Sequence, residues 1–129
     1  LYVNGADMTS VESTATAKLQ ASKDADVIIG LGAPITLTLL KSVATAGSSA
    51  KVASFDLNKE LAQKIDDGSV LFTVDQQPWL QGYGAVDAIW QNKRGGFKIG
   101  GGQPVLTGPA IVDKSNAADV LKFAEQGIR

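Results

Sequence analysis

The sequence contains no cysteine and no histidine. Without cysteine, the chain can form no disulfide, no thiolate metal site and no cysteine nucleophile. Without histidine, it lacks the most common general base and the most common transition-metal ligand. These two absences disfavour most enzyme chemistries. We therefore expect a protein that is not an enzyme and that uses no cofactor and no metal.

An excess of charge of one sign and long apolar runs are missing as well. The 12 Lys and Arg residues and the 13 Asp and Glu residues nearly cancel, which leaves a net charge of −1. Because nucleic-acid binding usually requires a basic surface, we expect no nucleic-acid partner. No apolar run approaches the roughly 18 residues that cross a bilayer. The chain begins at Leu1 and shows no signal peptide, so we expect a fragment of a longer polypeptide.

What is present suits a folded domain, with 129 residues that are 44% hydrophobic and 19% charged. Short apolar runs predict strands at residues 1–3, 26–31, 51–56 and 70–74. Apolar residues recur at helical spacing between these runs, after a capping box of Thr9 and Glu12, after Pro34 and after the cap Asn58. This alternation predicts an α/β fold with a mostly parallel, Rossmann-like sheet flanked by helices.

The pattern changes after residue 75. Residues 76–78 (QQP) break the strand pattern and predict a crossover. A helix is expected over 79–92, followed by a glycine-rich surface loop over 94–102. A short extended piece over 104–106 leads to a last helix, capped by Ser115 or Asn116.

The carboxyl ends of the predicted strands hold the candidate site, because ligands of open α/β sheets bind at that edge. The residues there are 4–8, 30–34, Asp56 and 75–77, which bring carboxylates and amides but no cation. Such groups suit a neutral, polyhydroxylated ligand, since their oxygens accept from hydroxyls and amide nitrogens donate back. A dinucleotide site is disfavoured because Ile35 stands where the third glycine of that fingerprint belongs.

Each candidate also has a structural interpretation. Asp56 could cap a turn, although Asn58 already fills that role, and Gln76 could satisfy backbone groups at the crossover. Asp75 could brace the crossover instead of touching a ligand. Trp79 could stack on a sugar face, whereas helical spacing favours the core for Trp90.

Several segments resemble type I periplasmic sugar-binding proteins of the ribose-binding-like group, which serve ABC importers. The similar segments are 24–47, 51–56, 71–82 (LFTVDQQPWLQG) and 106–129. The resemblance implies two α/β lobes, joined by three crossovers, that close on a monosaccharide. It also implies that Asp56 and Gln76 bind sugar hydroxyls.

The sequence departs from that family at two places. The family's Asn-Asp contact falls on Gly32 and Ala33, and its Arg falls close to Met8. Both departures argue against ribose itself as the ligand. The candidate ligand-binding residues are therefore Asp56, Gln76, Gly32, Asp75 and Met8.

The resemblance implies an incomplete type I lobe. Residues 1–77 would be part of the C-terminal lobe, 78–103 a helix and glycine-rich loop of the N-terminal lobe, and 104–129 the third crossover and tail helix. The implied partners are a sugar or polyol, the remaining N-terminal portion and a membrane permease. The implied location is periplasmic or extracytoplasmic. The competing hypothesis is the effector-binding domain of a sugar-responsive transcriptional repressor, which shares this lobe architecture.

Overall fold

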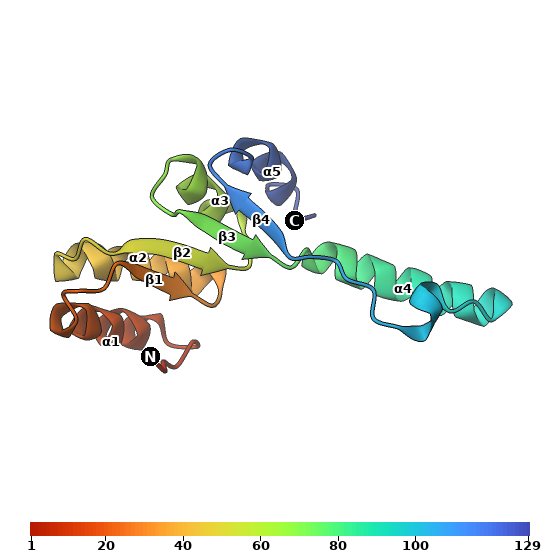
Figure 1. Cartoon of the computed structure of the whole chain (residues 1–129), viewed down its shortest axis with the longest axis horizontal. Coiled ribbons are helices and arrows are strands. Elements are labelled where there is room, and N and C mark those ends of the chain that lie inside the picture. The colour runs from red at the N-terminus through yellow and green to blue at the C-terminus, as the bar shows by residue number, and fades with distance from the viewer.

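Four strands and five α-helices follow one another in the computed structural model, which describes residues 1–129 (Figure 1). The strands are β1 (Val27–Gly30), β2 (Lys51–Phe55), β3 (Phe72–Asp75) and β4 (Ala110–Asp113). The helices are α1 (Met8–Ala21), α2 (Ala33–Ala46), α3 (Lys59–Asp66), α4 (Pro78–Gly95) and α5 (Ala117–Ala124), with a 3-10 turn η1 (Ile99–Gly102).

The strands form one sheet in the order β1-β2-β3-β4. The first three strands are parallel, and β4 pairs antiparallel with β3. The predicted α/β fold with a mostly parallel sheet is confirmed. One predicted strand, residues 1–3, is absent from the structure, and one strand of the structure, β4, was not predicted. Residues 1–3 pair with no strand of the sheet, whereas β4 pairs with β3.

The start of α1 differs from the predicted capping box. Asp7 is the N-cap, and its Oδ1 accepts from the backbone N–H groups of Thr9 and Ser10, each at 3.1 Å. Thr9 therefore lies inside the helix instead of capping it. The physical reason is that the Asp7 carboxylate, placed two residues earlier, accepts two of the free N–H groups of the first turn.

The next two helices have the predicted ends. α2 has Pro34 in its first turn and stops at Gly47, whose φ of 61° lies in the left-handed region that glycine tolerates. Asn58 caps α3, and its Oδ1 accepts from the N–H of Leu61 at 2.8 Å. Pro34 and Asn58 therefore mark where the loops at the sheet's carboxyl edge end and the next helices begin.

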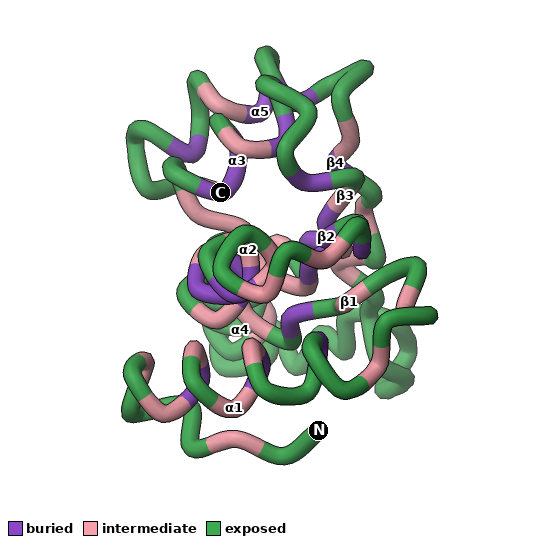
Figure 2. The backbone as a smooth tube through the Cα atoms, turned by 90° about the vertical axis from the view of Figure 1, so that its left-hand side faces the viewer, coloured by how far each residue is buried: buried purple, intermediate pink, exposed green.

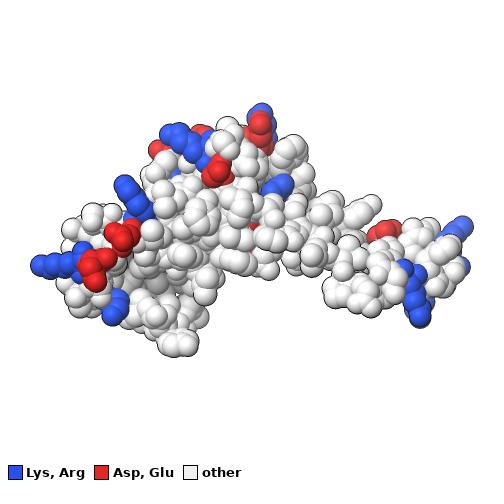
Figure 3. Space-filling view, viewed as in Figure 1, with Lys and Arg blue, Asp and Glu red and all other residues white.

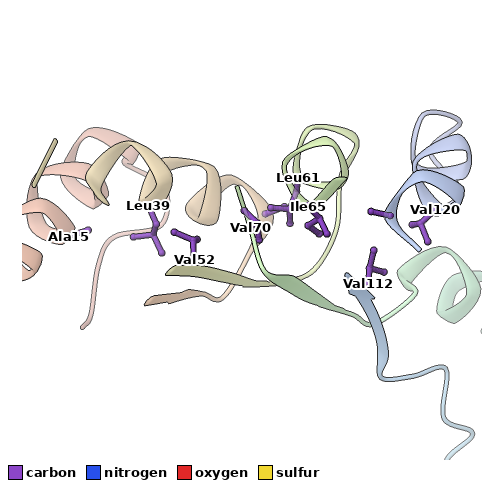
Figure 4. Close-up of a cluster of buried hydrophobic side chains, with 10 residues drawn as sticks. Ala15, Leu39, Val52, Leu61, Ile65, Val70, Val112 and Val120 are labelled. Atoms are coloured by element: carbon purple, nitrogen blue, oxygen red, sulfur yellow. The ribbon is translucent and has the colours of Figure 1, made fainter. Parts of the chain in front are cut away.

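The core lies between one face of the sheet and the helices that cover it (Figures 2 and 4). Helix α2 packs on β1 and β2, while α3 and α5 pack on β4 and on each other. The buried apolar side chains that Figure 4 labels are Ala15, Leu39, Val52, Leu61, Ile65, Val70, Val112 and Val120. Burial of this apolar area is the main stabilising term of the fold.

The opposite face of the sheet is open. Ile29 and Ile111 alternate with core-facing neighbours on β1 and β4 and remain 57% and 51% exposed. Charged side chains gather at the ends and the upper side of the molecule, which leaves the middle of the view in Figure 3 largely uncharged. This face of the sheet is therefore apolar and exposed on the edge strands β1 and β4, while Ala53 of β2 on the same face is buried.

Helix α4 extends away from the rest of the fold (Figure 1). None of its residues is buried. It continues to Gly95, and η1 follows within residues 99–102, so the expectation of a plain loop over 94–102 was wrong in part. Lys93 and Arg94 in the last turn suit the negative end of the helix and extend it into the glycine-rich stretch.

Candidate ligand-binding site at the carboxyl ends of the strands

Asp56 and Gln76 meet at the carboxyl ends of β2 and β3. The Nε2 of Gln76 donates to Oδ1 of Asp56 at 2.6 Å. Asp56 adopts a left-handed backbone conformation with a φ of 66°. Its carbonyl accepts from Oγ1 of Thr73 at 2.5 Å, and its N–H donates to the carbonyl of Val74 at 2.9 Å. Both backbone groups of Asp56 are therefore hydrogen-bonded to β3. Gln76 donates to Oδ1, so Oδ2 is the carboxylate oxygen without a hydrogen-bond partner in the chain.

A buried hydroxyl pair connects the Gly32 loop to β2. Oγ1 of Thr36 lies 2.6 Å from Oγ of Ser54 and donates to the carbonyl of Gly32 at 2.9 Å. Ser54 stands two residues before Asp56 in the chain. The sequence reasoning missed Thr36 and Ser54, and the only signal for them was their place beside the strand ends.

Gly30 permits this close approach of α2 to the sheet. A Cβ at position 30 would lie 2.2 Å from Oγ1 of Thr36 and 2.9 Å from its Cα. Only a residue without a Cβ fits there. The glycine thus has a packing role, separate from the phosphate binding of a dinucleotide site.

Asp75 lies in the same crossover but is completely buried. Its Oδ1 accepts from the N–H of Gln77 at 2.8 Å, and its Oδ2 accepts from Nε and Nη2 of Arg129 at 3.0 and 2.8 Å. Both carboxylate oxygens are occupied by groups of the chain. This geometry favours the bracing interpretation of Asp75.

Met8 lies at the first position of α1, at the same edge of the molecule as the Gly32 loop. Its sulfur accepts from Oγ1 of Thr38 at 3.5 Å. This contact links the starts of α1 and α2. No hydrogen bond joins Met8 or Gly32 to Asp56 or Gln76, so among the five candidates only Asp56 and Gln76 are joined by a side-chain hydrogen bond.

The returning segment before β4 lies beside the outgoing crossover. Oγ1 of Thr107 donates to the carbonyl of Gln76 at 3.0 Å, and Nε2 of Gln77 donates to the carbonyl of Thr107. Nε2 of Gln81 donates to the same Gln76 carbonyl at 2.8 Å. Thr107 was not singled out from the sequence, because it lies 31 residues from its partner Gln76.

A groove of about 910 Å³ opens between α4, this returning segment and the end of the sheet. Most of its surface is apolar, as at Phe55, Leu80 and Leu106. Its polar lining residues are Gln76, Gln81, Asp87, Gln103 and Thr107. No cluster of three or more carboxylates is placed to hold a metal ion. None of the helices has both the length and the apolar character needed to cross a membrane.

Comparison with known proteins identifies the family. The model of the periplasmic binding protein domain matches residues 2–96. A comparison with curated protein sequences finds no significant match. The solved structures that are similar include a carbohydrate transporter from Acidothermus cellulolyticus 11B in complex with myo-inositol. It is 50% identical, with a TM-score of 0.96, and the match covers 100% of this chain and 45% of that one.

Two more distant structures share the fold. The Caulobacter myo-inositol binding protein is 23% identical with a TM-score of 0.76, over 92% of this chain and 41% of that one. An ABC transporter solute-binding protein from Agrobacterium vitis, bound with alpha-D-tagatopyranose, is 24% identical with a TM-score of 0.73, over 90% and 39%.

The chain thus spans less than half the length of these structures. Its sheet and flanking helices are those of a type I periplasmic binding protein lobe, as the resemblance predicted. Together, the family match over residues 2–96 and the superposition on a 50% identical structure show that this chain belongs to the periplasmic binding protein domain family.

Proposed function

We propose that the chain supplies one side of a sugar- or polyol-binding site in the solute-binding component of an ABC transporter. The observation that carries the proposal is the contact between Asp56 and Gln76, 2.6 Å apart at the carboxyl ends of parallel strands. The free carboxylate oxygen of Asp56 can accept from a ligand hydroxyl in a charge-assisted bond. Gln76 orients that carboxylate and can donate to the ligand after a small rotation.

The ligand class that we propose is a neutral cyclic polyol, with myo-inositol as the first candidate. The support is the 50% identical transporter structure that holds myo-inositol. The Gly32 loop offers backbone groups where the ribose-binding-like family has Asn and Asp side chains, and Met8 replaces a charged residue. Both replacements favour a ligand other than ribose.

The proposed mechanism is capture by closure, without any chemical step. Residues 1–77 and 104–129 would form part of one lobe, and residues 78–103 would belong to the other. A ligand that touches both lobes stabilises the closed arrangement by its additional contacts. The closed, extracytoplasmic protein would then deliver the ligand to a membrane permease.

Titration calorimetry tests this function directly. The complete gene product that carries this sequence is titrated with myo-inositol and, in parallel, with D-ribose. We expect saturable binding of myo-inositol and weaker or undetectable binding of D-ribose. Absence of binding for myo-inositol and for a set of hexoses and pentoses would contradict the proposal.

A further inference from the structure

The ion pair of Asp75 and Arg129 differs from the other ion pairs of the chain. The Asp75 side chain is fully buried and that of Arg129 is 25% exposed, whereas the partners of the other three pairs are 40% to 81% exposed. A buried carboxylate requires compensation, because removal of one partner of a buried pair leaves the other charge both desolvated and unpaired. Arg129 supplies that compensation with two donors on one oxygen.

The second oxygen of Asp75 holds the backbone of the crossover. It accepts from the N–H of Gln77, whose φ of 57° and ψ of 58° are left-handed for a residue with a side chain. A non-glycine residue in this region is strained and is held there by its surroundings. At Gln77 the surroundings are the Asp75 carboxylate and the Thr107 carbonyl.

The left-handed turn at Gln77 directly follows Gln76 and constrains the peptide that joins the two residues. Gln76 stands between the buried Asp75 and the left-handed Gln77, and its side chain reaches Asp56 at 2.6 Å. A change in the backbone at Gln77 would turn the Gln76 peptide and move its amide away from Asp56. The fully buried Asp75 is the chain neighbour of Gln76, the most exposed member of the candidate site.

We propose that Asp75 and Arg129 are positioning residues of the ligand site, which fix the Gln76–Gln77 turn so that the Gln76 amide orients Asp56. This proposal rests on the proposed function. It assigns no ligand contact to either residue. It predicts that loss of the pair weakens ligand binding even where the fold remains stable.

Three variants of the complete gene product separate positioning from charge compensation. R129M leaves the Asp75 carboxylate buried and unpaired. D75L/R129M removes both charges and also the acceptor for Gln77, and D75N/R129M removes both charges but keeps an acceptor at position 75. Each variant is measured for its midpoint of thermal unfolding, its Kd for myo-inositol and the hydrogen exchange of the Gln77 amide.

We expect R129M to lose both stability and affinity. D75L/R129M should regain stability, because apolar replacement of a buried ion pair is often neutral. Its Kd should nevertheless rise about tenfold, the scale of a lost hydrogen bond to a ligand, and its Gln77 amide should exchange faster. D75N/R129M should bind more tightly than D75L/R129M, because Asn keeps the contact with the Gln77 N–H.

The ion pair of Lys59 and Glu125 provides the matched control. It also joins two segments that are distant in the chain, with Nζ and Oε1 3.1 Å apart, but its side chains are 56% and 47% exposed. E125Q should leave the Kd and the Gln77 exchange unchanged. Wild-type affinity in D75L/R129M, or an equal loss in E125Q, would overturn the proposal. If the wild-type protein binds no sugar, the proposed function fails, while unchanged Gln77 exchange in D75L/R129M would separately refute the positioning role.

Discussion

Asp56 is held through three of its polar groups, and only its second carboxylate oxygen lacks a partner. Its N–H, its carbonyl and Oδ1 contact Val74, Thr73 and Gln76. A residue fixed in this way loses little freedom when a ligand arrives, so the contact that we propose with a ligand hydroxyl would be preorganised. The same contacts explain why Asp56 adopts a left-handed φ without being a glycine.

Substitution of Asp56 tests the ligand contact at the level of one side chain. D56A should weaken binding of myo-inositol by about 2–3 kcal/mol, because a charge-assisted bond is lost and a ligand hydroxyl is left unpaired. Calorimetry of the complete gene product measures the effect. D24A is the control, since Asp24 is an exposed carboxylate near the opposite end of β1. Unchanged affinity in D56A would remove Asp56 from the site.

A second prediction concerns the pKa of Asp113, whose carboxylate lies at the turn before α5. Hydrogen bonds from the side chain and the backbone of Ser115 lower the pKa of Asp113 below its ordinary value. A lowered folded-state pKa means that the charged form stabilises the fold above the ordinary pKa. That contribution is lost as the pH falls through the folded-state pKa.

S115A should therefore raise the pKa of Asp113 toward its ordinary value. The side-chain bond from Ser115 Oγ disappears, while the bond from its N–H can persist. Carboxyl NMR titration measures the shift. The pKa of Asp119 is lowered mainly by a side-chain hydrogen bond from Lys122, so it should not move in this variant.

At the scale of elements, Gly30 decides how closely α2 approaches the sheet. G30A would place a Cβ 2.2 Å from Oγ1 of Thr36 and 2.9 Å from its backbone, so we expect a loss of about 1–3 kcal/mol in the free energy of unfolding. Denaturant unfolding measures this loss. A G30A variant as stable as the wild type would show that α2 can shift outward without cost.

Gly82 in α4 gives the matched control for that substitution. No atom lies within 4 Å of a Cβ built at position 82. Because glycine in a helix interior is less favourable than alanine by roughly 0.5–1 kcal/mol, G82A should leave stability unchanged or raise it slightly. Opposite signs for the two variants would separate a steric clash from helix propensity.

The elements that the sequence predicted correctly are those with local signals. Pro34, Gly47 and Asn58 mark helix ends through their own backbone chemistry, and short apolar runs mark β1 to β3. β4 lacked such a signal, because Pro109 and a short apolar stretch also suit a loop. It forms because β3 offers an unpaired edge.

The candidate site was predictable only in part for the same reason. Asp56 and Gln76 follow from the rule for strand ends, but the contact between Asp75 and Arg129 joins residues that are 54 positions apart. No sequence pattern within a short window predicts a contact between residues so far apart. Thr36 and Ser54, 18 positions apart, are a second example of a contact that only the folded chain reveals.

At the scale of the whole molecule, large apolar side chains are exposed to solvent on α4 and on one face of the sheet. Helix α4 buries no residue, although it carries Trp79, Tyr83 and Trp90. The open sheet face adds Ile29 and Ile111. Helices of this length gain most of their stability from packing, so α4 depends on contacts beyond those that this chain supplies.

Hydrogen exchange of the 129-residue polypeptide tests this dependence. We expect the amides of α4 to exchange far faster than those of α2, because local opening costs little where few apolar contacts are broken. Helix α2 is the internal control, since it packs on α1, β1 and β2. Equal protection of the two helices would contradict the expectation and would indicate that α4 is covered, for example by self-association.

The register of β3 and β4 has a consequence for the topology of the chain. Asp75 and Ala110 are paired neighbours across the two antiparallel strands, so the whole of residues 76–109 leaves from and returns to one point. β3 and β4 thus form a β-hairpin with a long connection, and this connection contains helix α4. Because the two ends of residues 76–109 lie together, the length of this connection is not fixed by the register of β3 and β4. The same connection begins with Gln76 and Gln77, so the contact with Asp56 is made by its first residue.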